Sequence, residues 1–162
     1  MRILAVLMLV AVLRPTAVAA ASGDRLDWPL RPRPALMRTF EGPELRWQRG
    51  HRGVDLAAAP GQAVYAAQAG TVVFAGELAG RGVVSVAHPG GLRTSYEPVR
   101  ATVGPGSMIA AGAVLGSVVA GHPGCSAPAC LHWGAMWGPA ARADYVDPLG
   151  LLAETPIRLK PY

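Results

Sequence analysis

The 162-residue sequence has very little lysine and cysteine. Lys160 is its only lysine, and it lies close to the C-terminal end. Domains that carry a lipoyl or biotinyl group have similar strands rich in glycine and valine, but they need a lysine at the tip of a hairpin. This class is therefore excluded. The sequence also lacks the combination of aromatic and basic residues that is typical of nucleic-acid binding, so we expect no nucleic-acid partner.

Long hydrophobic runs are missing except at the N-terminus. Residues 3–13 form an apolar run after one positive charge, and small residues follow it. This pattern is typical of a secretory signal peptide, here with cleavage at about residues 19–22. A membrane anchor is the alternative, but a span needs about 20 apolar residues, and Arg14 and Pro15 interrupt the run. We expect residues 1–20 to be removed and the protein to be secreted, with no membrane contact afterwards.

The two cysteines, Cys125 and Cys130, leave three alternatives. An exported chain meets an oxidising environment, where an even number of cysteines favours a disulfide. Such a bond would close a short loop and stabilise the fold by about 2 kcal/mol through loop entropy. A thiolate of Cys130 bound to a metal and a free thiol are the other two alternatives.

The charge is moderately positive. Without residues 1–20 the chain loses Arg2 and Arg14, and its formal charge falls from +5 to +3. A mild excess of arginine suits an anionic polymer as a partner, but surface arginines are usually just solvated charges. Charge alone therefore identifies no partner.

Beyond residue 20, no segment has a convincing helical period with capping residues. Short stretches with β-branched residues alternate with glycine and proline at spacings of about ten residues, which is typical of antiparallel sandwiches and barrels. We therefore predict an all-β fold with a compact antiparallel β-sheet core. The predicted strands cover residues 63–66, 70–76, 82–88, 91–96, 108–109, 114–120 and 130–136.

Four segments follow from this pattern and from the N-terminal run. Residues 1–20 are the signal peptide, and residues 21–46 form a strap rich in proline and arginine that we expect on the surface rather than in the core. Residues 47–152 form the β-core domain, which ends in a closing turn at residues 147–152. Residues 153–162 are a C-terminal tail.

The motif GHRGVD places His51 four residues before Asp55. On a straight strand the two residues would lie roughly 13 Å apart, too far for one metal, whose ligand atoms each lie about 2 Å from it. A shared metal requires the chain to curl, which Gly50 and Gly53 would allow. His132 is a third candidate ligand, although a single histidine on a strand is more often a core residue. Two imidazoles and one carboxylate form a zinc set that leaves a fourth position for water.

Five segments follow one another in a specific order. They are GHRGVDLAA, PGQAVYAAQAGTVVFAG, VVSVAHPGGLRTSYEPV, VGPGSMIAAGAVLGSV and CLHWGAM. In order, spacing and glycines they resemble the lysostaphin-type (LytM-like) zinc metallopeptidases, a family of peptidoglycan endopeptidases. The resemblance covers residues 50–136, with a weaker similarity at residues 145–152. It implies a compact antiparallel β-sheet core and one zinc ion. By position, it implies His51, Asp55 and His132 as the zinc ligands.

Two further histidines of that family, which act in catalysis without binding zinc, have no counterpart here. The first histidine of the family's H-x-H motif corresponds to Cys130, and the histidine of its Thr-x-Tyr-x-His pattern corresponds to Pro98. A positioned acid or base is typically worth about 10²- to 10⁴-fold in rate. The resemblance therefore implies either weakened activity or a substitute for these groups.

Three residues are candidates for the missing catalytic groups. His122 lies in a loop flanked by glycine and proline, shortly before the two cysteines. Glu97 precedes residue 98, but on a strand it would face the opposite side. His88 follows a predicted strand, where packing or orientation is the plainer interpretation. Tyr96 could donate to an oxyanion, although it is more typical of a strand aromatic.

The resemblance implies a function as well as a fold. We expect a secreted, cell-wall-associated and monomeric protein that hydrolyses amide bonds in peptidoglycan peptides with a zinc-activated water. The alternative is a catalytically inactive module of the same fold that binds the cell wall or activates another hydrolase.

Overall fold

The computed structural model describes residues 25–45 and 47–153. The expected signal peptide, residues 1–20, lies outside the described residues. So does the expected tail, apart from Ala153.

The described chain folds into short antiparallel strands, which confirms the predicted all-β fold. The strands are β1 (Leu36–Arg38), β2 (Val54–Ala58), β3 (Ala63–Tyr65), β4 (Gly70–Leu78), β5 (Arg81–Ala87), β6 (Leu92–Glu97), β7 (Val99–Ala101), β8 (Met108–Ile109), β9 (Val114–Val118), β10 (Ala129–Trp137) and β11 (Asp144–Val146). Among the described residues, helical geometry is confined to single 3-10 turns at Pro89–Gly91, Ala140–Arg142 and Pro148–Leu151. The last of these is the predicted closing turn. In the part of the chain that the structure describes, no helix could traverse a bilayer.

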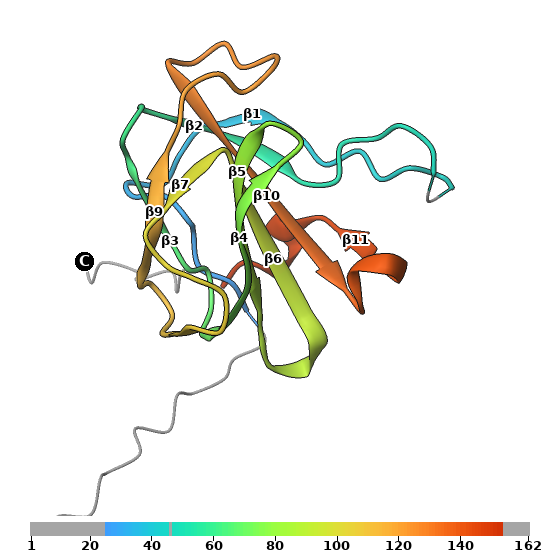
Figure 1. Ribbon diagram of the computed structural model, residues 1–162. Helices are drawn as coiled ribbons and strands as arrows, with labels where there is room; N and C mark the ends of the chain where they lie inside the picture. Colours follow the sequence, from blue (N-terminus) through green and yellow to red (C-terminus); the bar gives the residue numbers. More distant parts are fainter. Residues whose placement is uncertain (1–24, 46, 154–162) are drawn as a thin grey trace, which may run out of the picture.

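Two sheets pack against each other, with β10 near the middle of the larger one (Figure 1). The larger sheet has the order β1-β2-β10-β6-β5-β4-β8, with β11 paired to one end of β10, and the smaller has the order β3-β9-β7. All seven predicted strands are present. The strands β1, β2, β7 and β11 were not predicted, because their sequences carry no clear alternation of apolar and polar residues.

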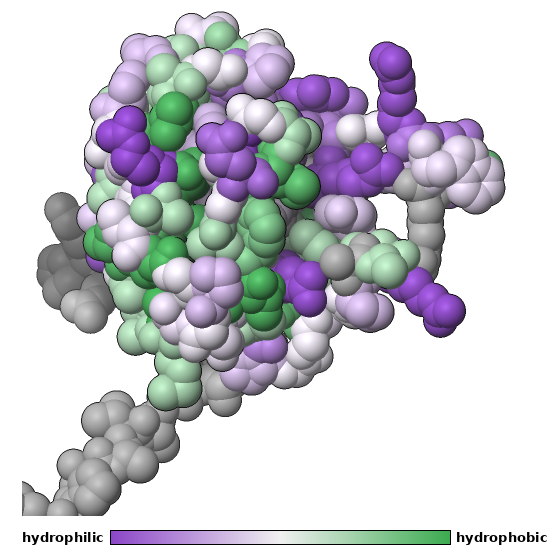
Figure 2. Space-filling view, viewed as in Figure 1, coloured by the Kyte–Doolittle hydropathy of each residue, from purple (hydrophilic) through white to green (hydrophobic). Residues whose placement is uncertain are grey.

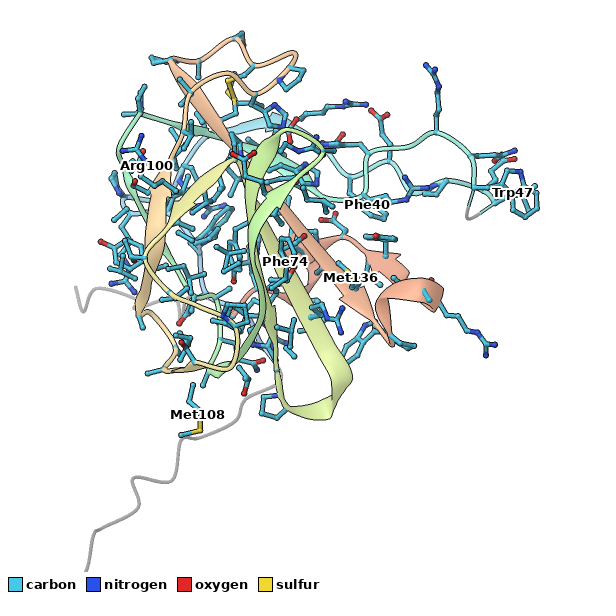
Figure 3. The ribbon with its side chains drawn as sticks, viewed as in Figure 1. Phe40, Trp47, Phe74, Arg100, Met108 and Met136 are labelled. Atoms are coloured by element: carbon cyan, nitrogen blue, oxygen red, sulfur yellow. A yellow bond between two sulfur atoms is a disulfide. The ribbon has the colours of Figure 1, made fainter. Side chains whose placement is uncertain are left out.

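Side chains of β10 alternate between the core and a surface cleft, as the pleat of a strand requires. Leu131, Trp133 and Ala135 are fully buried between the sheets. His132 and Met136 line the cleft on the other side, and Figure 3 labels Met136. One strand therefore supplies both the centre of the core and part of the candidate site.

The segment rich in proline and arginine reaches into the core, so the expectation that it lies only on the surface is wrong. Leu26 and Leu30 are fully buried, and the ring of Trp28 lies 6.3 Å from that of Trp133. The apolar residues of this segment occur singly between polar residues and prolines, so the sequence shows no apolar run that would indicate burial. The guanidinium of Arg33 lies over the Trp28 ring, which lets the charge stay near the surface.

The loop between β1 and β2 projects from the body of the fold (Figure 1). Figure 2 shows hydrophilic side chains along this loop. Trp47 stands near its far end, where 80% of the residue is exposed (Figure 3). At the base of the loop, Glu41 and His51 exchange two backbone hydrogen bonds of 2.9 Å. The base of the loop thereby fixes the backbone at His51.

His88 lies in a buried hydrogen-bond network rather than in the cleft. Its Nδ1 is 3.0 Å from the carbonyl oxygen of Ala69, and its Nε2 is 2.7 Å from Thr94 Oγ1. The hydroxyl oxygens of Thr94 and Tyr96 are 2.9 Å apart, and the backbone N–H of Ala67 donates to Tyr96. A carbonyl oxygen can only accept, so His88 donates from Nδ1 and its neutral ring accepts at Nε2.

Burial lowers the pKa of His88 below its ordinary value of 6.5, although the hydrogen bond to Ala69 acts in the opposite direction. Below that pH the unfolded chain binds a proton more readily than the folded chain does. The free energy of unfolding should therefore fall as the pH drops through about 6.5, by at most about 1.4 kcal/mol per pH unit from this residue. Urea unfolding of the wild type and of His88→Gln between about pH 7.5 and about pH 5 would measure this. Equal pH slopes for the two proteins would contradict the prediction.

Candidate metal centre

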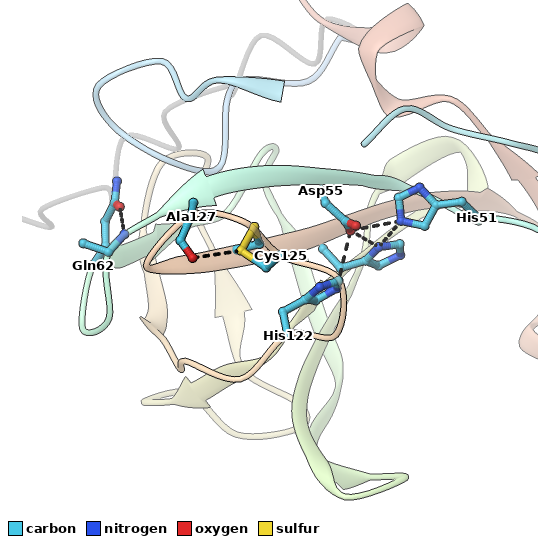
Figure 4. Close-up of a disulfide and its surroundings, with 9 residues drawn as sticks. His51, Asp55, Gln62, His122, Cys125 and Ala127 are labelled. Atoms are coloured by element: carbon cyan, nitrogen blue, oxygen red, sulfur yellow. Dashed lines mark hydrogen bonds and ion pairs between the residues drawn. A yellow bond between two sulfur atoms is a disulfide. The ribbon is translucent and has the colours of Figure 1, made fainter. Parts of the chain in front are cut away.

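Three side-chain donor atoms converge at one place beside the cleft, which His51 and His132 line (Figure 4). His51 Nε2 is 3.0 Å from Asp55 Oδ1 and 3.0 Å from His132 Nδ1. His132 Nδ1 is 2.8 Å from Asp55 Oδ1. These are the residues that the sequence resemblance implied as ligands, and their donor atoms form a compact group.

Strand pairing and the β1–β2 loop bring the three residues together. Asp55 on β2 and His132 on β10 are direct partners across the two neighbouring strands. His51 lies just before β2, and the chain bends at Gly53 between them. The curl that a shared metal requires is therefore present, and it replaces the long separation of a straight strand.

Gly50 and Gly53 are needed for space and not for unusual backbone angles. Neither has a positive φ. A Cβ at Gly53 would lie 2.5 Å from the carbonyl oxygen of Trp133 and 2.7 Å from His132 Nε2, and one at Gly50 would lie 2.6 Å from the carbonyl oxygen of Glu41. The glycines are thus compatible with the expected curl, but through the space that they leave and not through a positive φ. They let the loop and the strands approach closely.

The hydrogen bond behind His51 fixes the position of its proton. His51 Nδ1 is 2.6 Å from the carbonyl oxygen of Thr39, which can only accept, so Nδ1 carries the hydrogen. In the neutral ring, Nε2 then presents a lone pair toward Asp55 Oδ1, which is also an acceptor. A cation at this point would satisfy both atoms. A histidine that binds a metal usually donates its other ring N–H in this way.

The donor set fits zinc. Two imidazole nitrogens and one carboxylate oxygen are a known zinc set, with ligand distances of about 2.0–2.2 Å. The three donor atoms, all within 4.8 Å of one another, are close enough for one ion to reach them all. The set leaves one position open, as in catalytic rather than structural zinc sites.

Asp55 is held in its charged form. Its burial on its own would raise the pKa. The hydrogen bond from His132 and the charges of His122, His132 and His51 outweigh that effect and bring the pKa below the ordinary value of 3.8. The candidate site therefore keeps an anionic donor group at neutral and mildly acidic pH.

His122 also reaches the site, which the sequence did not make plain. Its Nε2 is 3.4 Å from Asp55 Oδ1 (Figure 4). Its ring stacks on that of His132, with centroids 6.2 Å apart and planes inclined by 13°. It is not in the compact group formed by the donor atoms of His51, Asp55 and His132. His122 therefore stands beside the three donors rather than among them.

A disulfide joins Cys125 and Cys130. Cys130 is fully buried on β10, two residues before His132 and on the same side of the strand. Because its sulfur is in this bond, the alternatives of a metal-bound thiolate and a free thiol do not describe this structure.

Glu97 faces the cleft, while Pro98 lines a separate hollow. Glu97 is the direct partner of His132 across β6 and β10, and its carboxylate lies 2.9 Å from the guanidinium of Arg81. That hydrogen-bonded pair raises the pKa of Arg81. The expectation that Glu97 points away from the site is therefore wrong, since β6 turns residue 97 and not residue 98 toward the cleft.

The other candidates named from the sequence lie elsewhere. His88 and Tyr96 share the buried network described above, and neither is among the residues that line the cleft. The cleft has a volume of about 500 Å³, and it is lined mainly by polar and charged groups. These include Arg38, Arg52, Arg81, Ser85, Ser95, Glu97, His122 and Tyr145.

Comparison with known proteins matches this region to a family. The sequence model of peptidase family M23 matches residues 49–148. The chain is 65% identical over 156 residues to the uncharacterized protein Rv2891 of Mycobacterium tuberculosis (strain ATCC 25618 / H37Rv), covering 96% of this chain and 63% of that protein. The chain thus spans less than two thirds of the length of the curated relatives that it matches.

Solved structures are similar as well. Helicobacter pylori Csd3 is 28% identical, with a TM-score of 0.63, over 85% of this chain and 37% of Csd3. Lysostaphin is 22% identical, with a TM-score of 0.57, over 77% of this chain and 57% of lysostaphin. The second similarity concerns the fold alone.

Proposed function

Because this chain belongs to peptidase family M23, we propose that it is a zinc metalloendopeptidase that cleaves amide bonds in peptidoglycan peptides. The observation that carries the proposal is the triangle of His51 Nε2, Asp55 Oδ1 and His132 Nδ1, with edges of 2.8–3.0 Å, beside a polar cleft. Residues 47–152 would be the catalytic domain of a secreted, monomeric, cell-wall-associated protein that has lost residues 1–20.

The residues of the chain hold and orient the reacting groups. His51, Asp55 and His132 would bind the metal, and the carbonyl of Thr39 keeps the His51 ring in place. A bound zinc ion lowers the pKa of water and polarises a carbonyl group. Arg52 lines the same cleft, and its positive charge would attract the carboxylates of a wall peptide.

Hydrolysis of purified cell wall tests this function. The full secreted chain should release dye from labelled peptidoglycan, lose that activity on treatment with a chelator, and recover it when zinc is added back. Absence of activity in the zinc-loaded protein, or activity that the chelator leaves unchanged, would overturn the enzymatic proposal.

A second candidate function is a wall-binding or hydrolase-activating module. It is favoured by Cys130 and Pro98, which stand where the resemblance places the family's two catalytic histidines. Such a module should sediment with purified cell wall and release no fragments. Clear turnover by the pure protein would exclude it.

A further inference from the structure

The disulfide ties His122 to the strand that carries His132. The backbone N–H of Cys125 donates to the carbonyl oxygen of His122 over 3.3 Å, so residues 122–125 form one turn. Cys125 is then bonded to Cys130 on β10. His132 lies two residues after Cys130, on the same side of β10. One turn and one covalent bond therefore set where the His122 ring lies.

The His122 ring has its polar contact in the metal centre. Its side chain is only 12% exposed, and its Nε2 lies 3.4 Å from Asp55 Oδ1. Its Nδ1 is buried and has no hydrogen-bond partner among the residues that the structure describes. The ring is thus aimed at the candidate site and is not used to hold the loop together.

The position of the disulfide explains why His122, a loop residue, lies beside the candidate metal centre. The resemblance places a histidine at position 130, on the same side of β10 as His132. Here that position holds a cysteine, whose bond to Cys125 brings the loop and its imidazole back over the site. The histidine would have moved from the strand to the loop, and the disulfide would hold it in reach (Figure 4).

We propose that the loop anchored by Cys125 and Cys130 holds His122 as a hydrogen-bond donor to a molecule bound at the metal. The three protein ligands leave one position open, and the Nε2–H of His122 donates to the oxygen of the molecule that occupies it. This inference rests on the metal site of the proposed function. The ligand class is an oxygen donor, which for a substrate is the carbonyl of the amide. Where that ligand is a substrate amide, His122 would be a catalytic residue, and the disulfide positions it.

Binding of acetohydroxamate to the full chain loaded with Co²⁺ tests this without relying on turnover. The visible spectrum of the metal reports binding. His122→Ala should keep one metal per chain and bind acetohydroxamate about 10- to 100-fold more weakly, the loss expected for one hydrogen bond to a charged group. The double variant Cys125→Ser/Cys130→Ser should show the same loss, because its loop is released.

Two further variants separate this role from a general effect on the fold. His122→Gln keeps an N–H donor at the end of a similar side chain and should recover part of the affinity. Ser126→Ala changes an exposed residue between the two cysteines and should bind acetohydroxamate as the wild type does. If the double cysteine variant fails to fold, the alanine and glutamine variants of His122 still decide the matter.

The outcomes distinguish this inference from the proposed function. Equal affinity of metal-loaded His122→Ala and wild type overturns the inference, even if the wild type cleaves cell wall. Loss of metal from His122→Ala would make it a fourth ligand and also overturns it, as does a loaded wild type that binds no acetohydroxamate. Weaker binding by His122→Ala, with no hydrolysis by the wild type, supports the inference and overturns the enzymatic proposal.

Discussion

Replacing His132 with alanine should remove metal binding and hydrolysis while leaving the fold intact. His132 supplies one of only three donor atoms in the group, and its Nδ1 lies within 3.0 Å of both others. Loss of a partner that merely supports a ligand typically costs about 10- to 100-fold in metal affinity, so loss of a ligand should cost more than about 100-fold. The side chain points to the cleft, so little of the core is disturbed.

Zinc content, zinc affinity and dye release from cell wall, measured together with the thermal unfolding midpoint, check this prediction. Asp144→Asn is a matched control, because it neutralises an exposed carboxylate on β11, beside β10. It should keep wild-type zinc affinity. If His132→Ala bound one zinc per chain as tightly as the wild type, the ligand assignment would be contradicted.

Much of the candidate metal centre could be predicted from the sequence, because its residues occur in ordered motifs. The motifs could not reveal the register of strand pairing. In the structure His132 on β10 pairs with Asp55 on β2 at one edge and with Glu97 on β6 at the other. A shift of one residue would have turned these side chains into the core. This explains why the direction of Glu97 was wrongly predicted from the position of Pro98 alone.

The place of His122 depended on information that the sequence holds only indirectly. A loop residue comes near a site through the closure of its loop, and here closure depends on the bond between Cys125 and Cys130. From the sequence, that bond was one of three alternatives. As long as this disulfide is not known, the sequence shows only a histidine between glycine and proline. It does not indicate where the side chain of His122 points.

The fold was predictable where strands are long and alternate, as in β4, β5 and β10, and less so elsewhere. The strand β2 reads VDLAA and is mostly buried, so alternation is weak although the strand carries Asp55. The burial of Leu26 and Leu30 could not be seen either, because it depends on distant parts of the chain. The N–H of Leu26, for example, donates to the carbonyl of Leu151.

Replacing Trp133 with alanine should have the largest effect on stability. Trp133 is fully buried in the centre of β10 and packs near Trp28. Removing so large a buried side chain typically costs about 3–5 kcal/mol, because burial is lost and a cavity remains. Domains are stable by only about 5–15 kcal/mol, so a large share of the free energy of unfolding would be lost.

Urea unfolding of Trp133→Ala beside Trp137→Ala separates this effect from the loss of any tryptophan. Trp137 lies at the end of the same strand and is 38% exposed, so its replacement should cost less than about 1.5 kcal/mol. Trp133 and His132 face opposite sides of β10. The folded fraction of Trp133→Ala should therefore still bind zinc, whereas His132→Ala should stay folded without it. Similar losses of stability for both tryptophan variants would contradict the assignment of Trp133 to the centre of the core.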